Sequence, residues 1–344
     1  MEFSRSGAPH LPPENTVSKV MLQVILALIP GILAMVWFFG VGVLIQIALS
    51  ILFAVLLEWA MLKLRGKPIR PFLSDYSAVV TAILFALCIP PLAPWWISLV
   101  GMIAAIVVAK HLYGGLGQNI FNPAMVAYVV VLIAFPLELT RWLAPRGLID
   151  VELLPGLLQS LQTIISGLPA NLSWDAITQA TPLDLLKDGV EQNQMISEIR
   201  QAPVFGNYGG RGWEWIANFF ALGGIWLIWR RVISWHIPVA IIASVIMITL
   251  PAWLYDPSSN PIPLQHIFSG ALVLCAFFIA TDPVTGCASR RGKIIFGLGV
   301  AILTLTIRLW GGYPDGVAFA VLLMNMFAPL IDRYTRPRAY GKPR

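Results

Sequence analysis

The chain consists largely of long apolar runs, and these runs restrict its fold more than any other feature. A helix of about 20 predominantly apolar residues crosses the hydrocarbon core of a bilayer. Only 12% of the residues are charged, whereas a water-soluble protein typically carries about 25%. We predict an all-α membrane protein with about ten transmembrane helices, at residues 20–38, 42–62, 76–93, 95–110, 122–137, 213–230, 233–254, 265–281, 293–310 and 314–332.

The lysines and arginines lie in short connections between the apolar runs, although the net charge of +6 alone would also suit nucleic acid. Seventeen of the 23 fall on the side that holds both chain ends, and the short connections opposite hold only Arg308. Cytoplasmic connections of membrane proteins carry such an excess. We therefore predict a multi-pass protein of the bacterial inner membrane, in contact with lipid and not nucleic acid. Its termini would be cytoplasmic and residues 138–212 periplasmic, opening with an amphipathic stretch, 148–168, along the membrane surface.

Two short stretches of sequence recur in the second half of the chain. His111-Leu-Tyr-Gly-Gly matches Arg308-Leu-Trp-Gly-Gly, and Ser77-Ala-Val-Val-Thr-Ala matches Ser269-Gly-Ala-Leu-Val-Leu. The matches pair the third and fourth helices with the eighth and ninth, so each half holds an odd number of helices. This predicts the inverted repeat common in transporters, with chance similarity of glycine-rich helix ends as the alternative. The expected parts are 1–137, 138–212 and 213–344.

The long segment between the halves contains a helix start that would suit a phosphate group. Its sequence is Asp175-Ala-Ile-Thr-Gln-Ala-Thr-Pro-Leu-Asp-Leu-Leu-Lys. Thr181 before Pro182 is typical of an N-cap with proline at the first helical position, and Asp184 completes an approximate capping box. We expect the helix to run toward Ile199, with N–H groups at its start that favour an anion. On these residues alone, a capped surface helix without a ligand is the simpler interpretation.

The same residues resemble the flavin-attachment motif of the D subunits of Rnf electron transport complexes. The B subunits of sodium-translocating NADH:quinone reductases share this motif. In this family the last threonine of a Ser/Thr-Gly-Ala-Thr motif carries FMN through a phosphoester bond, which a separate flavin transferase makes. The resemblance implies Thr181 as the covalent FMN acceptor and Asp175, Thr178 and Ala180 as recognition positions. Gln179 stands where the family typically has glycine.

Further family signatures follow in family order along almost the whole chain, at residues 6–10, 114–124, 280–285 and 313–316. The resemblance implies a fold similar to urea and ammonium channels, and an electron-relaying subunit of a multi-subunit translocase. Such complexes move electrons between reduced ferredoxin and NAD and couple this transfer to movement of sodium ions or protons. This chain itself should bind neither NAD nor an iron–sulfur cluster. It lacks a Gly-rich nucleotide fingerprint after a strand, and Cys88, Cys275 and Cys287 are too scattered.

A second group of polar residues follows the fourth apolar run, in Gly114-Gly-Leu-Gly-Gln-Asn-Ile-Phe-Asn-Pro. Glycines among polar positions indicate an irregular backbone of the kind that lines cavities in transporters. Family members carry a non-covalent riboflavin in the membrane part. Asn119 and Asn122, whose amides could pair with the edge of a flavin, are our candidates for it. A plain connecting loop with an Asn-Pro helix start is the alternative.

Three carboxylates near helix ends have both functional and structural interpretations. Asp282, after the eighth run, would serve an ion path or a flavin contact, or form a helix-stop turn with a salt bridge to Arg290 and Arg291. Asp315 occupies the corresponding place on the other side. Glu58 lies inside the second run, where a carboxylate is a functional candidate unless it snorkels or pairs with nearby bases such as Lys63 and Arg65.

The alternative function for the whole chain is a channel or secondary transporter without redox chemistry. The predicted inverted repeat suits such a protein as well as it suits a redox subunit. Covalent flavin on Thr181 would separate the two hypotheses.

Overall fold

The computed structural model describes residues 16–149, 154–169 and 173–335. These residues form helices joined by loops, with three isolated β-bridges. The predicted all-α class is therefore confirmed for the described part of the chain. The family signature at residues 6–10 lies outside the described residues.

Helices occupy all five apolar runs of the N-terminal half. They are α1 (Val17–Phe39), α2 (Gly42–Leu64), α4 (Ser77–Ala86) after the short α3 (Ile69–Leu73), α5 (Trp95–Met102) continued by the π-helix η1 (Ile103–His111), and α6 (Pro123–Ala134). Helix α4 ends at Ala86, short of the expected residue 93. Pro90, Pro91 and Pro94 follow closely, and they lack the N–H groups that a continuing helix needs.

Helices also occupy all five apolar runs of the C-terminal half. Its helices are α12 (Trp213–Trp229), α13 (His236–Tyr255), α14 (Pro263–Phe268), α15 (Leu272–Leu274) continued by the π-helix η3 (Cys275–Ile279), α16 (Arg290–Trp310) and α17 (Val317–Thr335). The eighth run is interrupted at Gly270, whose φ of 70° favours glycine over any residue with a side chain.

Six spans among the described residues are long and apolar enough to cross a membrane. They are Val17–Phe39, Gly42–Leu64, Ile69–Ala86, His236–Tyr255, Arg290–Trp310 and Val317–Thr335. The chain is thus a multi-pass membrane protein by length and composition of its helices. The helices in the other four apolar runs are shorter, so the number of ten spans stays a prediction.

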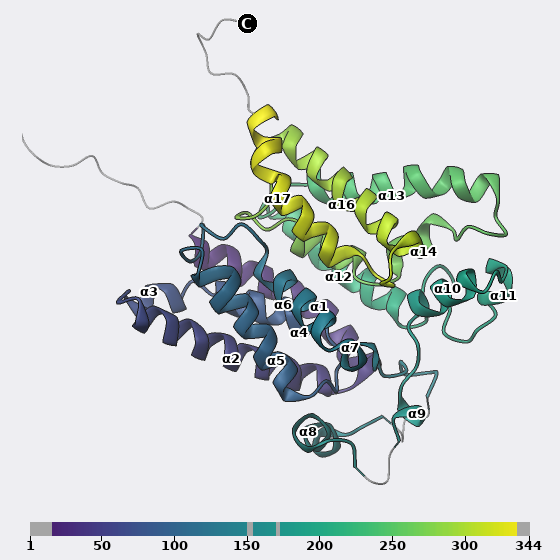
Figure 1. Cartoon of the computed structure of the whole chain (residues 1–344), viewed down its shortest axis with the longest axis horizontal. Coiled ribbons are helices and arrows are strands. Elements are labelled where there is room, and N and C mark those ends of the chain that lie inside the picture. The colour runs from purple at the N-terminus through teal and green to yellow at the C-terminus, as the bar shows by residue number, and fades with distance from the viewer. Residues whose placement is uncertain (1–15, 150–153, 170–172, 336–344) are drawn as a thin grey trace, which may run out of the picture.

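The two halves lie side by side, as the purple-to-blue and green-to-yellow helices in Figure 1 show. Helix α1 packs against α12, and α6 packs against α17. Inside the halves, α2 contacts α4 and η1, while α13 contacts η3 and α16. Helices in corresponding apolar runs therefore have corresponding neighbours. The inverted symmetry itself remains a prediction.

The interface between the halves depends on glycine. Gly223 of α12 faces the carbonyl oxygen of Ala27 in α1 so closely that a Cβ atom would clash with it. The ring of Phe220 likewise fills the place of a Cβ on Gly31. Small residues let neighbouring membrane helices approach closely, which explains how α1 and α12 pack backbone against backbone.

The segment between the halves carries short helices: α7 (Pro136–Thr140), α8 (Leu157–Ser166), α9 (Trp174–Ile177), α10 (Pro182–Glu191) and α11 (Ile196–Ile199). The expectation of one helix from Pro182 to Ile199 is wrong. Asn193 takes a left-handed φ of 59° after α10, which turns the chain. Helix α11 then packs back, with Ile199 against Gly189, where a larger residue would not fit.

Candidate functional site

Thr181 begins α10 with the predicted capping box. Its hydroxyl donates to Asp184 Oδ2 at 2.6 Å, and its backbone N–H donates to the same oxygen at 3.0 Å. In return, the Asp184 N–H donates to the Thr181 hydroxyl at 3.3 Å. Pro182 occupies the first helical position. The sequence therefore predicted the start of this helix correctly, residue by residue.

The extended residues before Thr181 are tied to the chain that follows α7. The Ala144 N–H donates to the Ile177 carbonyl at 2.9 Å, and the Gln179 N–H donates to the Trp142 carbonyl at 3.0 Å. Thr178 lies between these contacts, opposite Leu143. These backbone bonds fix where α10 begins relative to α7.

The predicted recognition positions differ in accessibility. Asp175, in the first turn of α9, and Ala180 are exposed. Thr178 is half-buried, and its hydroxyl donates to the Trp174 carbonyl at 2.7 Å. Thr181 is also half-buried. The four residues thus lie along the short stretch from α9 to the start of α10.

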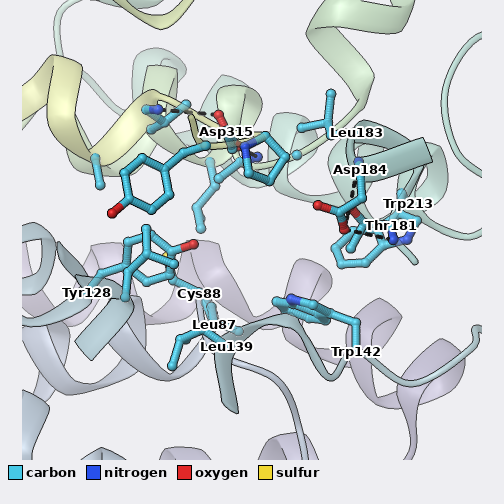
Figure 2. Close-up of a pocket in the computed structure, with 18 of the residues that line it drawn as sticks. Leu87, Cys88, Tyr128, Leu139, Trp142, Thr181, Leu183, Asp184, Trp213 and Asp315 are labelled. Atoms are coloured by element: carbon cyan, nitrogen blue, oxygen red, sulfur yellow. Dashed lines mark hydrogen bonds between the residues drawn. The ribbon is translucent and has the colours of Figure 1, made fainter. Parts of the chain in front are cut away.

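Thr181 lies at the rim of a cavity of about 330 Å³, which we call the outer cavity because it borders the segment predicted to be periplasmic. Figure 2 shows Thr181 and Asp184 beside Trp213, with Tyr128 and Cys88 at the other end of the cavity. The indoles of Trp142 and Trp213 meet edge to face, with ring centroids 4.9 Å apart. The sequence alone predicts no role for Trp142 and Trp213 in this site, because their meeting depends on the fold.

Asp315 lines the same cavity and is held by Arg308. One of its oxygens accepts from Arg308 Nη2 at 3.1 Å, and the other accepts from the Ala271 N–H at 2.9 Å. Arg308 also donates to the carbonyls of His266 and Ser269. This pair fixes the interrupted eighth run next to the outer cavity, and it explains why an arginine stands on the side that is otherwise poor in basic residues.

Helix α10 is fastened to the same region by Lys187. The Lys187 ammonium donates to the Gly311 carbonyl and, at 3.3 Å, to that of Tyr313. Carbonyl oxygens stabilise a cation, so this contact joins the segment between the halves to the loop after α16.

A second cavity, of about 290 Å³, lies at the opposite end of the interface between the halves. We call it the inner cavity. Its walls include Asn119, Asn122, Lys110, Thr281 and Asp282. Both asparagines from the second predicted group are buried there, so the structure brings the two residues together with a cavity.

The two asparagines have different roles in this wall. The Asn122 side chain caps α6, because Oδ1 accepts from the N–H groups of Ala124 and Met125 while Nδ2 donates to the Ile279 carbonyl. Asn119 donates to the Phe121 carbonyl at 3.2 Å, but its buried Oδ1 has no hydrogen-bond partner among the described residues. A buried polar atom without a partner costs free energy and often marks a place for a ligand or water. Asn119 is therefore the stronger candidate for ligand binding.

One known family matches almost the whole chain. It is described as the NQR2, RnfD, RnfE family, and its sequence pattern matches residues 4–341. The chain belongs to this family.

Its relatives within the family are similar over almost their whole length. The D subunit of the ion-translocating oxidoreductase complex of Ectopseudomonas mendocina is 51% identical, over 99% of this chain and 96% of the relative. The D subunits of the same name from Aliivibrio salmonicida and Escherichia coli K12 are each 46% identical, over 99% of both chains. The resemblance to the D subunits that the motifs indicated is thus confirmed.

Asp282 forms the local turn of the structural alternative, but the salt bridge that this alternative included is wrong. Its carboxylate accepts from the Val284 N–H at 3.3 Å and from the Thr285 hydroxyl at 2.7 Å. Neither Arg290 nor Arg291, both within the described residues, forms an ion pair with it. Burial raises the pKa of Asp282 above its usual value.

The sequence alone predicts no role for Asn325, whose side chain connects three elements beside the inner cavity. Its Oδ1 accepts from the Asn122 N–H at 3.0 Å, and its Nδ2 donates to the Thr285 carbonyl at 3.2 Å. The side chain thereby joins α17 to the start of α6 and to the turn after η3. Asn325 is the one amide in the apolar run of α17, and this isolation was the signal that could have identified it.

Proposed function

We propose that the chain acts as the D subunit of an ion-translocating oxidoreductase complex and carries a covalent flavin on Thr181. The position of the Thr181 hydroxyl, at the rim of a cavity with aromatic walls, is the observation that carries this proposal. Family membership over residues 4–341 supports it independently. The names of the relatives refer to a complex, so other subunits are proposed partners.

The outer cavity has the size and lining that a flavin ring requires. Ligand cavities usually measure about 300–1,000 Å³ and are mostly apolar with a few polar groups, and this cavity of about 330 Å³ lies at the lower end. Trp142 and Trp213 offer flat aromatic surfaces, and Leu139 and Leu183 complete the apolar lining. A bound flavin supplies the ability to pass electrons one or two at a time.

The start of α10 suits the phosphate of such a flavin. Thr181 is the N-cap, so a phosphate on its hydroxyl would lie at the positive end of the helix dipole. The N–H groups of the first turn are the donors that anions bind at helix starts. An ester would replace the hydroxyl hydrogen that Asp184 accepts, so the Asp184 carboxylate would have to turn away from the phosphate. With that rotation, the residues present fit an FMN phosphoester made by a flavin transferase, with Trp142 and Trp213 lining the place of the ring.

For the inner cavity, we propose a non-covalent riboflavin. The unpartnered Oδ1 of Asn119 would accept a hydrogen bond from its ring edge or its hydroxyl groups. Asn122 would shape the cavity without bonding the ligand, because the oxygen and the nitrogen of its amide already have partners. The apolar side chains of Phe277, Phe278 and Leu84 form much of the remaining surface.

In the proposed arrangement the chain is inserted in the bacterial inner membrane with cytoplasmic termini. The distribution of Lys and Arg supports this orientation, which places α10 and the outer cavity on the periplasmic side. Electrons exchanged between ferredoxin and NAD would then pass through this chain, coupled to movement of sodium ions or protons.

The covalent attachment is tested by replacing Thr181 with valine in protein co-expressed with a flavin transferase. The wild-type band on a denaturing gel should fluoresce under ultraviolet light, and Thr181→Val should remove the fluorescence. Thr140→Val is the matched control, because Thr140 lines the same cavity and its hydroxyl donates to the Leu137 carbonyl. A fluorescent Thr181→Val band would reject Thr181 as acceptor. A dark wild-type band would instead favour a channel or transporter without redox chemistry.

The inner cavity is tested by extracting the flavin that is not covalently bound. Asn119→Ala should release most of this flavin during purification while the fluorescent band on the denaturing gel persists. Gln118→Ala is the control, because Gln118 is an exposed amide one residue earlier. Equal amounts of extractable flavin in wild type and Asn119→Ala would exclude a role for Asn119.

A further inference from the structure

Helix α8 exposes three large apolar side chains, while Ile164 and two hydroxyl residues face the protein. Leu158 is 80% exposed and Ile165 63% exposed, and Leu157 also faces outward. Ser160 and Thr163 lie against the protein and are buried. On a water-soluble surface, large apolar side chains such as Leu157, Leu158 and Ile165 would be expected to face the core.

The hydroxyls on the buried side make their hydrogen bonds locally. Ser160 donates to the Pro155 carbonyl at 3.2 Å, and Thr163 donates to the Gln159 carbonyl at 2.7 Å. The hydroxyls of Ser160 and Thr163 therefore need no hydrogen bond from water or from another protein. Leu157, Leu158 and Ile165, by contrast, are left uncovered by the described residues.

Helix α8 lies at the outer end of the first two long helices. It packs against α2, and the Pro155 carbonyl just before it lies next to Gly40, between α1 and α2. Figure 1 shows α8 almost end-on while α1 and α2 run across the view, so α8 crosses the direction of the spans. The guanidinium of Arg146 stacks on the exposed Trp37 at the same end of α1, and such residues are typical of the membrane–water boundary.

We propose that α8 lies flat in the outer leaflet of the membrane, with Leu157, Leu158 and Ile165 inserted between phospholipids. Helix α2, against which it packs, also exposes apolar side chains, among them Leu44 and Leu52. Residues 153–174 contain no charged side chain that would resist insertion. A short helix that lies in the boundary plane with its apolar side in the acyl region fits these observations.

A photoreactive side chain tests this proposal directly. Leu158 is replaced by p-benzoyl-phenylalanine in the full chain, and the complex is reconstituted in liposomes of phosphatidylethanolamine and phosphatidylglycerol. Illumination should attach a phospholipid at position 158, which intact-mass spectrometry detects. The same replacement at Glu191, exposed at the end of α10, is the water-facing control and should give no lipid adduct.

The outcomes distinguish lipid from protein. A phospholipid adduct at position 158 and none at 191 supports the proposal. A cross-link from 158 to another protein of the complex shows that α8 is a protein interface and overturns it, and the absence of any adduct at 158 does the same. Because Leu158 is largely exposed, the replacement should not disturb folding, and the amount of purified complex checks this.

Discussion

At the residue scale, Glu58 forms a buried ion pair that connects distant parts of the N-terminal half. Its carboxylate is 2.9 Å from Lys110 Nζ and 3.2 Å from His111 Nε2, and it is only 1% exposed. Lys110 also donates to the Ser77 hydroxyl. The alternative of pairing with Lys63 or Arg65 is wrong, because the π-helix η1 places Lys110 and His111 against the Glu58 carboxylate.

Glu58→Gln should therefore destabilise the protein strongly. It would leave the Lys110 ammonium buried without a counter-charge, and breaking such a pair typically costs about 3–5 kcal/mol. Thermal unfolding in detergent measures the loss. The double variant Glu58→Gln, Lys110→Met should recover much of the stability, since it removes both charges. Equal stability of Glu58→Gln and wild type would show that the pair contributes little.

The raised pKa of Asp282 predicts that the stability of the folded chain depends on pH. Burial raises its pKa in the folded chain, so the unfolded chain ionises first, near the usual pKa of about 4. The folded state consequently loses stability as the pH rises from there to the folded pKa. Asp282→Asn should unfold at a higher temperature than wild type near about pH 8, with the difference shrinking toward about pH 4. Melting temperatures of both proteins across this pH range test the prediction. A difference between them that does not change with pH would show that the raised pKa of Asp282 is not its cause.

At the element scale, one charged side chain of α10 reaches across to the C-terminal half and helps to hold the helix in place. Lys187 joins it to the carbonyls of Gly311 and Tyr313. Hydrogen bonds from charged groups contribute about 1.5–3 kcal/mol. Lys187→Met should therefore raise hydrogen exchange in residues 182–191 and 311–313 by about tenfold or more. Arg200→Met, which removes a bond to Asn207 within the segment, should leave 311–313 unchanged. Unaltered exchange in Lys187→Met would contradict this anchoring role.

The elements also show how far sequence patterns reach. Each apolar run contains a helix, because apolar length is a local property, and the N-cap at Thr181 follows from three neighbouring residues. The breaks at Pro90 and Gly270 shorten helices in the third and eighth runs. The partners of Glu58 and Asn325 could not be inferred, because they lie on helices that only the tertiary fold brings together. For the same reason the aromatic cavity beside Thr181 could not be predicted, because Trp142 and Trp213 meet only in the tertiary fold.

At the scale of the whole molecule, the distribution of basic residues predicts which end faces the cytoplasm. Gln194→Cys, exposed between α10 and α11, should react with a membrane-impermeant maleimide in intact spheroplasts. Arg70→Cys, exposed in α3, should react only after the membrane is permeabilised. Wild type controls for the native cysteines, two of which are buried. The reverse pattern would invert the proposed topology.

The two cavities approach each other at the interface between the halves. Ala124 lines the inner cavity and Met125 the outer one, and Phe278 and Ile279 divide in the same way. The apolar wall between the cavities is therefore much thinner than a bilayer of about 30 Å. If water or polarisable groups fill both cavities, most of the membrane voltage falls across this wall. A charge crossing it would then exchange about 2.3 kcal/mol per 100 mV with the electric field. With both cavities filled in this way, the electrical work of crossing the membrane would be concentrated in a short step.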